Sequence, residues 1–210
     1  DELGVSENTL IVFTGENGTD VPVVTSLNGK SVAGGKGKAN HDSGVRTPFF
    51  VTMPGTVQAG KVSDELVDFS DLLPTFCELA KIDTSENKNL DGVSLLPTLI
   101  GKGERKKPWS YLFYSRNDAT QPASSVVVRN ATHLVYRKGG PDKKIEFFDC
   151  SIPYARKLQK PSDLSDDERK VFAELSSVMK RYDTQYQSDL SKDAVQQWQK
   201  KTKAGKKKKK

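Results

Sequence analysis

Apolar residues in the first half of the chain gather in short runs that end at turn residues. Residues 9–14 read TLIVFT and stop at a Gly-Glu-Asn-Gly turn, and residues 49–53 read FFVTM and stop at Pro-Gly. Short apolar, β-branched runs with such ends are typical of strands buried in a layered sheet. We therefore expect residues 9–14 to form a parallel strand buried on both faces, and residues 49–53 to form a second buried strand. Residues 21–25 are expected to form a minor strand.

Helical spacing follows these runs. Asp71 is a candidate cap for a helix over residues 71–81, in which Pro74 is tolerated because it falls in the first turn. Ser94 is a candidate cap for a shorter helix that ends near Gly101. Strands followed by helices predict an α/β layer in this part of the chain.

The pattern changes near residue 109. Short strands separated by turn residues are expected at 111–114, 125–129, 134–137 and 145–149, a spacing typical of an antiparallel sheet. Ser165-x-x-Glu168 is a capping box, and apolar residues at helical spacing follow it. The sequence therefore predicts three regions: an α/β part over 1–105, a small antiparallel sheet packed with a helix over 106–190, and a basic tail over 191–210.

Composition is that of a soluble globular protein, with 35% hydrophobic and 29% charged residues. No apolar run reaches the roughly 18 residues that a transmembrane helix needs. The net charge of +6 comes from the tail, because eight lysines lie between residue 200 and the end of the chain. We expect this tail to be solvated rather than to bind nucleic acid, with an anionic polymer or membrane surface as the alternative partner. Cys77 and Cys150 are too few for a disulfide framework and have no metal-binding spacing.

Four segments in this order resemble the sulfatase family of the alkaline phosphatase superfamily. They are ENTLIVFTGENG (7–18), GGKGKANHDSGVRTPFFVTMPG (34–55), VSDELVDFSDLLPTFCELAKI (62–82) and LDGVSLLPTLIG (90–101). The resemblance is strong up to about residue 103 and looser beyond it, where KIEFFDCSIPYAR takes the place of the family's Leu-Tyr-Asp-Leu segment. It implies an α/β fold, namely the C-terminal part of an alkaline-phosphatase-like sandwich, and an arylsulfatase-like sulfuric ester hydrolase as the parent protein.

Glu16 and Asn17 follow the first strand and offer hard oxygen donors, which suit Ca²⁺ or Mg²⁺. The resemblance implies that they match the Asp-Asn pair of the family's divalent-cation site, expected to hold Ca²⁺ with Mg²⁺ as the alternative. Glu16 departs from the usual Asp, and its extra methylene places the carboxylate one bond further out. The alternative interpretation is a polar turn, because Asn-Gly is a common turn pair.

Lys36 lies between glycines that let a ligand approach the backbone closely. The resemblance implies that it contacts the sulfate group and stabilises charge as the alcohol departs. The interval to Gly44 is one residue longer than usual in the family, so Lys38 is the alternative, and a solvated lysine is a third interpretation. His41, in the same loop, is a candidate proton donor or an exposed loop residue. Asp20 and Asp42 are candidate supporting groups, with a turn residue as the favoured interpretation of each.

Other residues favour structural interpretations. His133 falls in a predicted strand, and Arg46 is expected to form an ion pair that fixes its loop. The family's nucleophile is a formylglycine made from the Cys or Ser of a C/S-x-P-x-R motif, and the chain contains no such motif. Residues 150–156 (CSIPYAR) approach it only with the wrong spacing.

The sequence therefore predicts a sulfatase fragment that is inactive alone, acts in its parent on a sulfated carbohydrate or aryl sulfate, and has periplasmic or extracellular residence. The alternatives are a non-catalytic anion-binding module and a fragment of a phosphonate or phosphate ester hydrolase. The nucleophile region would distinguish the two hydrolases, whereas a complete hydrophobic core within these residues would favour the binding module.

Overall fold

The computed structural model describes residues 2–87, 89–103, 105, 107–114 and 125–189. The chain divides into two compact units. Unit 1 comprises Asp1–Ser110, Asn130–Thr132 and Cys150–Arg156, and unit 2 comprises Tyr111–Arg129, His133–Asp149 and the chain from Lys157 onward. The basic tail predicted over 191–210 lies outside the described residues.

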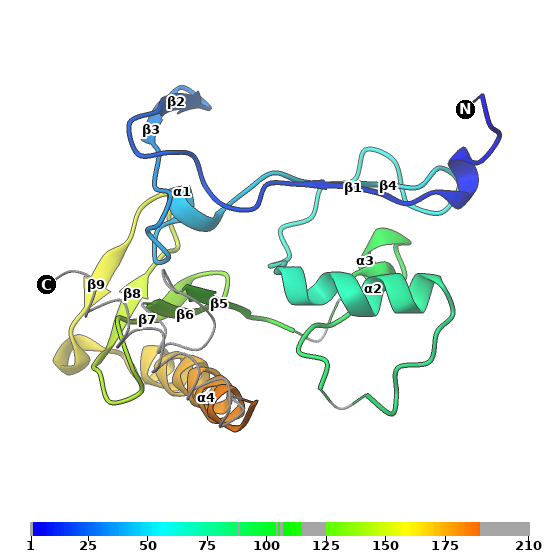
Figure 1. The fold of residues 1–210 in the computed structure, drawn as a ribbon. Coiled ribbons are helices and arrows are strands. Elements are labelled where there is room, and N and C mark those ends of the chain that lie inside the picture. Colours follow the sequence, from blue (N-terminus) through cyan, green and yellow to red (C-terminus); the bar gives the residue numbers. More distant parts are fainter. Residues whose placement is uncertain (1, 88, 104, 106, 115–124, 190–210) are drawn as a thin grey trace, which may run out of the picture. The chain divides into compact units, whose positions relative to one another are not determined.

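Unit 1 is built from short elements. Its strands are β1 (Ile11–Thr14), β2 (Val24–Leu27), β3 (Lys30–Ala33) and β4 (Phe49–Thr52), and its α-helices are α1 (Asp42–Val45), α2 (Leu72–Leu79) and α3 (Leu96–Leu99). Two 3₁₀ turns, Ser6–Asn8 and Phe69–Asp71, complete it. The strands form two separate antiparallel pairs, β1 with β4 and β2 with β3 (Figure 1).

The prediction for the first strand is wrong in two respects. β1 is antiparallel to β4, its one partner in the described part of the chain, and its side chains are not buried on both faces. Ile11 is 57% exposed, Phe13 62% and Phe50, opposite Phe13 in register, 65%. A single neighbouring strand cannot cover an apolar face, which explains why a run typical of buried strands is exposed here.

A hairpin that the sequence analysis missed joins β2 and β3. The minor strand expected at residues 21–25 begins at Val24, and β3 pairs with it in a register that places Leu27 opposite Lys30. Asn28 and Gly29 form the two-residue turn, both with positive φ (50° and 77°). This geometry favours Asn-Gly, so the dipeptide was an available signal.

α2 begins where predicted, but Asp71 does not cap it with its side chain. The Asp71 carboxylate is fully buried and accepts hydrogen bonds from the backbone N–H groups of Asp68 and Val93, at 3.0 and 2.9 Å. Two cations also contact it: Arg105 Nη1 and Lys107 Nζ, each at 2.9 Å. The predicted cap, Asp71, is therefore part of a buried ionic cluster with Arg105 and Lys107, which are distant in sequence.

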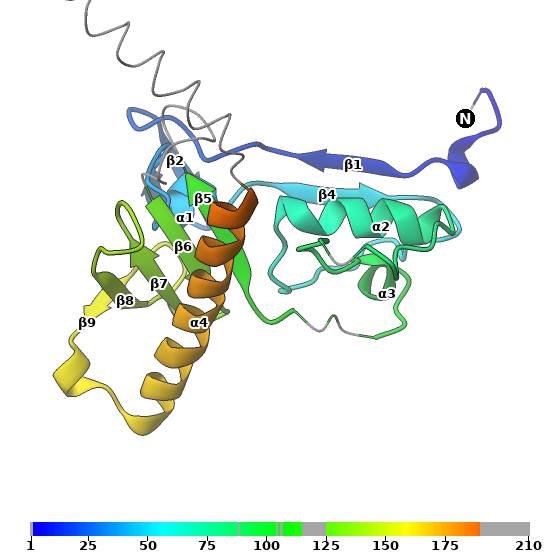
Figure 2. The same ribbon diagram turned by 60° about the horizontal axis from the view of Figure 1, so that its bottom comes forward.

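Unit 2 confirms the predicted antiparallel sheet and helix. The strands β5 (Ser110–Tyr114), β6 (Ser125–Arg129), β7 (His133–Arg137), β8 (Ile145–Asp149) and β9 (Lys157–Gln159) lie in sequence order, and β9 is an addition to the prediction. A 3₁₀ turn (Pro161–Asp163) precedes α4 (Asp166–Asp189). α4 packs on β6 and β7 (Figure 2).

The core of unit 2 lies between α4 and the sheet. Its most buried apolar side chains are Val126, Val128, Val135, Leu175 and Met179, each worth roughly 1.5–3 kcal/mol of burial. The predicted capping box is present, with the Ser165 N–H donating to Glu168 Oε2 at 2.7 Å and the Glu168 N–H donating to Ser165 Oγ at 3.3 Å. His133 stacks on Phe147 with ring centroids 5.0 Å apart, consistent with its structural interpretation.

Candidate functional site

Two loops of unit 1 carry all the predicted site residues. One follows β1 and contains Glu16 and Asn17, and the other runs from the end of β3 to β4 and contains Lys36, Lys38 and His41. Backbone hydrogen bonds join the loops: the Gly18 N–H donates to the Gly44 carbonyl at 2.9 Å, and the N–H groups of Gly35 and Lys36 both donate to the Thr19 carbonyl at 3.0 Å. The fold therefore holds residues that are about twenty positions apart in sequence side by side.

Glycines make this close approach possible. A Cβ on Gly18 would lie 2.0 Å from the Ser43 carbonyl oxygen, and a Cβ on Gly34 would lie 1.9 Å from the Asp20 carbonyl oxygen. Neither glycine has a positive φ, so proximity of backbone to backbone, rather than conformational freedom, explains the residue type. The two loops form one layer with little room for adjustment.

Glu16 and Lys36 meet across this junction. Glu16 Oε1 lies 3.8 Å from Lys36 Nζ, and the side chains are 80% and 47% exposed. An exposed pair at this distance contributes little stability, so both side chains are available to other charged partners. The structure thus places a carboxylate and an ammonium at one spot, where the sequence predicts a metal ligand and a sulfate contact.

Asn17 lies next to this pair on the same loop and is half-buried. Its amide and the Glu16 carboxylate are oxygen donors of the type that Ca²⁺ and Mg²⁺ take. Within the described ranges no group of three or more His, Cys, Asp or Glu side chains is placed to hold a metal ion. The donor types therefore fit a divalent cation, and Ca²⁺, which takes six to eight oxygens, needs further ligands.

Lys38 and His41 lie further along the second loop, where the Lys38 carbonyl accepts a hydrogen bond from the His41 N–H at 3.1 Å. Burial lowers the pKa of His41, and the positive charges of Arg156 and Lys38 lower it further, against an opposing effect of Asp42. The imidazole is therefore mostly uncharged at neutral pH, and the donor form that general acid catalysis needs is in the minority.

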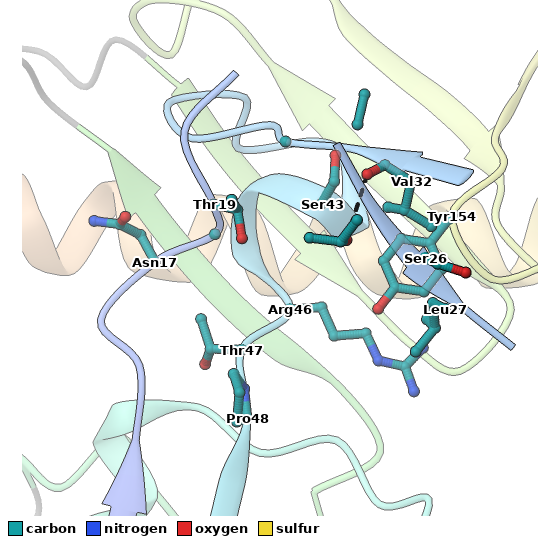
Figure 3. Close-up of a pocket in the computed structure, with 14 residues that line it drawn as sticks. Asn17, Thr19, Ser26, Leu27, Val32, Ser43, Arg46, Thr47, Pro48 and Tyr154 are labelled. Atoms are coloured by element: carbon teal, nitrogen blue, oxygen red, sulfur yellow. Dashed lines mark hydrogen bonds between the residues drawn. The ribbon is translucent and has the colours of Figure 1, made fainter. Parts of the chain in front are cut away.

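A pocket of about 160 Å³ adjoins the same loops (Figure 3). Asn17, Thr19, Gly34, Ser43, Arg46 and Tyr154 are among the residues that line it. Tyr154 was not among the predicted site residues, and Arg46 was expected to form an ion pair. Instead, the Arg46 guanidinium lies 5.7 Å from the centroid of the Tyr154 ring.

The chain is similar in sequence to known sulfatases. Residues 1–82 match the model of the sulfatase family. Human steryl-sulfatase is 36% identical over 124 residues, which are 56% of this chain and 21% of that protein. An extracellular sulfatase of Drosophila melanogaster is 35% identical over 130 residues, which are 59% of this chain and 11% of that protein. The matched part of the chain therefore spans 21% and 11% of the length of these two relatives.

Solved structures extend the likeness to most of the chain. A putative sulfatase from Bacteroides thetaiotaomicron is 25% identical with a TM-score of 0.63, over 89% of this chain and 38% of that one. A protein solved with its substrate D-glucosamine-2-N,6-O-disulfate is 18% identical with a TM-score of 0.60, over 90% of this chain and 36% of that one. The resemblance to sulfatases and the predicted fold class are confirmed.

Proposed function

We propose, on the premise that residues 1–82 carry sulfatase sequence, that this chain forms part of the active site of a sulfuric ester hydrolase. The observation that carries the proposal is the junction of Glu16 and Lys36, whose charged atoms lie 3.8 Å apart on two loops joined through glycines. Sulfatases act on sulfate esters, and a sulfate ester is an anion that a nearby cation such as the Lys36 ammonium stabilises.

Lys36 contacts the sulfate group in this proposal. Its ammonium is a compact charge that stabilises negative charge building on the oxygens as the alcohol leaves. Its backbone is fixed by the N–H bond to Thr19, so the stem of the side chain starts from a defined point. Lys38 is the alternative for this role. His41, kept mostly uncharged by burial and by Arg156, is the candidate proton-transfer group.

Asn17 and Glu16 supply two oxygen donors to a divalent cation, with Ca²⁺ favoured and Mg²⁺ as the alternative. The cation would supply electrostatic stabilisation of a bound sulfate. To hold the cation, Glu16 would give up its contact with Lys36, at little cost because the pair is exposed. The remaining ligands come from residues outside the Glu16–Asn17 pair.

The nucleophile is not among these 210 residues, because the sequence contains no C/S-x-P-x-R motif. We therefore expect no hydrolysis by the 210-residue chain alone. The substrate class is a sulfated carbohydrate or an aryl sulfate. Periplasmic or extracellular residence is part of the proposal, supported by the extracellular relative. No helix in the described part of the chain is long and apolar enough to cross a bilayer.

The first experiment is to read the coding sequence upstream of Asp1 for an acidic pair and a C/S-x-P-x-R motif. If both occur, the complete gene product is assayed on an aryl sulfate with Lys36→Ala and Asn17→Ala. We expect each to lower kcat/KM by at least about a hundredfold, a loss typical of one electrostatic contact to a transition state.

Lys38→Ala is the matched control, because it removes the same charge two residues away. We expect it to retain activity, and loss with Lys38→Ala but not with Lys36→Ala would exchange the two roles. If Lys36→Ala and Asn17→Ala both leave kcat/KM unchanged, the proposed site is wrong.

A further inference from the structure

The pocket beside Asn17 is lined by neither Glu16 nor Lys36. Its other walls are the β2–β3 hairpin, which contributes Ser26 and Leu27, and the α1–β4 connection, which contributes Arg46 and Thr47 (Figure 3). At about 160 Å³ it is smaller than the roughly 300–1,000 Å³ of pockets for drug-sized ligands. A group the size of one small ring is therefore the largest that it encloses.

Arg46 gives this pocket its charge. In the described residues its guanidinium has no carboxylate partner, and its contact is with the face of Tyr154 at 5.7 Å. An arginine held by an aromatic ring keeps its planar fork of donors for another group. Carboxylates and sulfates accept that fork in a bidentate arrangement. Ser26, Ser43 and Thr47, whose side chains carry hydroxyl groups, also line the pocket.

Tyr154 takes a backbone conformation that its residue type disfavours. It is the third residue of a turn in which the Ala155 N–H donates to the Ile152 carbonyl at 3.0 Å, and its φ is +62°. A positive φ at this position, after proline, favours glycine, and a bulky side chain there is strained. The Tyr154 N–H donates to Asp42 Oδ2 at 3.0 Å, which anchors the turn to α1.

We propose that this pocket is a second substrate subsite, which binds an anionic sugar unit next to the sulfate ester that is cleaved. The ring of the sugar lies against Tyr154, its carboxylate or sulfate pairs with Arg46, and its hydroxyls meet the serine and threonine side chains. Because Asn17 lines the pocket as well as belonging to the reaction site, the two subsites are contiguous. This inference rests on the proposed function, and it makes an acidic polysaccharide the preferred substrate.

The test is an NMR titration of the 210-residue chain, following the backbone amide signals of Tyr154 and Gly34. Four probes are compared: D-glucuronate, D-glucose 6-sulfate, D-glucose and inorganic sulfate. We expect both charged sugars to bind at least about tenfold more tightly than glucose, because hydrogen bonds to a charged group are stronger than those between neutral groups. Inorganic sulfate, which has no ring, is expected to shift the Tyr154 signal least among the anions. Preference for one charged sugar tells whether the pocket selects a carboxylate or a sulfate.

Arg46→Gln is expected to weaken the binding of charged sugars at least about tenfold, and Arg46→Lys to weaken it less. Tyr154→Gly is expected to abolish binding while the melting temperature stays the same or rises, because glycine relieves the positive φ. Lys102→Gln, which removes one exposed charge of unit 1 away from the pocket, is the matched control and is expected to change nothing.

Three results would overturn the subsite: no binding of either charged sugar, equal binding of glucose, or unchanged affinity in Arg46→Gln and Tyr154→Gly. Lys36→Ala separates this inference from the proposed function, because Lys36 does not line the pocket. If Lys36→Ala abolishes hydrolysis by the complete gene product but Arg46→Gln leaves sugar affinity unchanged, the proposed function is supported and the subsite is wrong. The opposite pair of results leaves a sugar-binding pocket without the proposed active site.

Discussion

Replacing Lys107 by methionine tests whether the buried ionic cluster holds unit 1 together. The Lys107 ammonium contacts Asp68 Oδ2 at 2.7 Å, Asp71 Oδ1 at 2.9 Å and Ser70 Oγ at 3.1 Å, and its side chain is 1% exposed. Methionine keeps most of the volume but removes the charge and all three hydrogen bonds. Two carboxylates then lose a shared cation in a site from which water is largely excluded.

The structure sets the size of the effect. Removing one partner of a buried ion pair typically costs about 3–5 kcal/mol, because the other charge is left unpaired. Asp71 keeps Arg105, and Asp68 is 16% exposed, so water and the remaining arginine compensate in part. We therefore expect Lys107→Met to lower the free energy of unfolding of unit 1 by about 3 kcal/mol, the lower end of that range.

Urea denaturation followed by the fluorescence of Trp109 measures this change. The ring centroid of Trp109 lies 5.1 Å from Lys107 Nζ, so the tryptophan reports on the cluster itself. Trp198→Phe in every variant removes the other tryptophan signal. Lys61→Met is the control, because Lys61 is exposed and, among the described residues, hydrogen-bonds to the Thr98 carbonyl alone. We expect it to change the free energy of unfolding by less than about 0.5 kcal/mol. A loss below about 1 kcal/mol for Lys107→Met would refute the reasoning.

The pH dependence gives a second readout. Burial acts to raise the pKa of Asp71, but hydrogen bonds from Asp68, Val93 and Lys107, with the Lys107 charge, bring that pKa below its ordinary value. Stability from Asp71 is therefore present above the unfolded pKa of about 3.9 and lost as pH falls through the lower folded pKa. Lys107→Met should raise the pKa of Asp71 in the folded state. The variant should therefore begin to lose stability at a higher pH than the parent chain does.

Three further changes test other parts of the structure. Ser165→Ala should lower the free energy of unfolding of unit 2 by about 1 kcal/mol, measured by circular dichroism, because it removes the capping hydroxyl of α4; no change would contradict the cap. Gly18→Ala should cost about 2 kcal/mol in thermal unfolding of unit 1, since its Cβ would lie 2.0 Å from the Ser43 oxygen, and an unchanged transition would contradict the tight junction. His41 should titrate below its ordinary pKa by NMR, and Arg156→Gln should raise that pKa; a fall or no shift would exclude the Arg156 contribution.

Local patterns predicted unit 2 well. Its strands are short apolar runs separated by turn residues, and the capping box of α4 is a contact between residues three positions apart. Such signals depend on neighbours in sequence, so the sequence shows them directly. β9 was missed because its three residues, Lys157–Gln159, are mostly exposed and carry no apolar run.

The failures in unit 1 come from partners distant in sequence. Asp71 was predicted to cap a helix because a cap is inferred from the few residues next to it. Arg105 and Lys107, the cations that contact its carboxylate, lie more than thirty residues away in sequence. β1 looked like a buried parallel strand because its composition suits one, yet only β4 pairs with it in the described residues. For the site, Lys36 and Glu16 could be selected from glycine-rich motifs. Tyr154 could not, because nothing in its turn sequence indicates that its backbone N–H bonds to Asp42 and that its ring lies against Arg46.

The junction between the two loops of unit 1 also bears on the chemical lifetime of the protein. The sequence contains two Asn-Gly pairs, at residues 17–18 and 28–29. Asn-Gly deamidates when the glycine nitrogen attacks the asparagine side chain and expels ammonia. The Gly18 nitrogen is tied to the Gly44 carbonyl in a tight junction, whereas Asn28-Gly29 sits at the exposed tip of a hairpin. We expect isoaspartate to accumulate at residue 28 well before residue 17 in peptide maps of aged protein. The same contact that brings the loops together would then protect the candidate metal ligand from ageing.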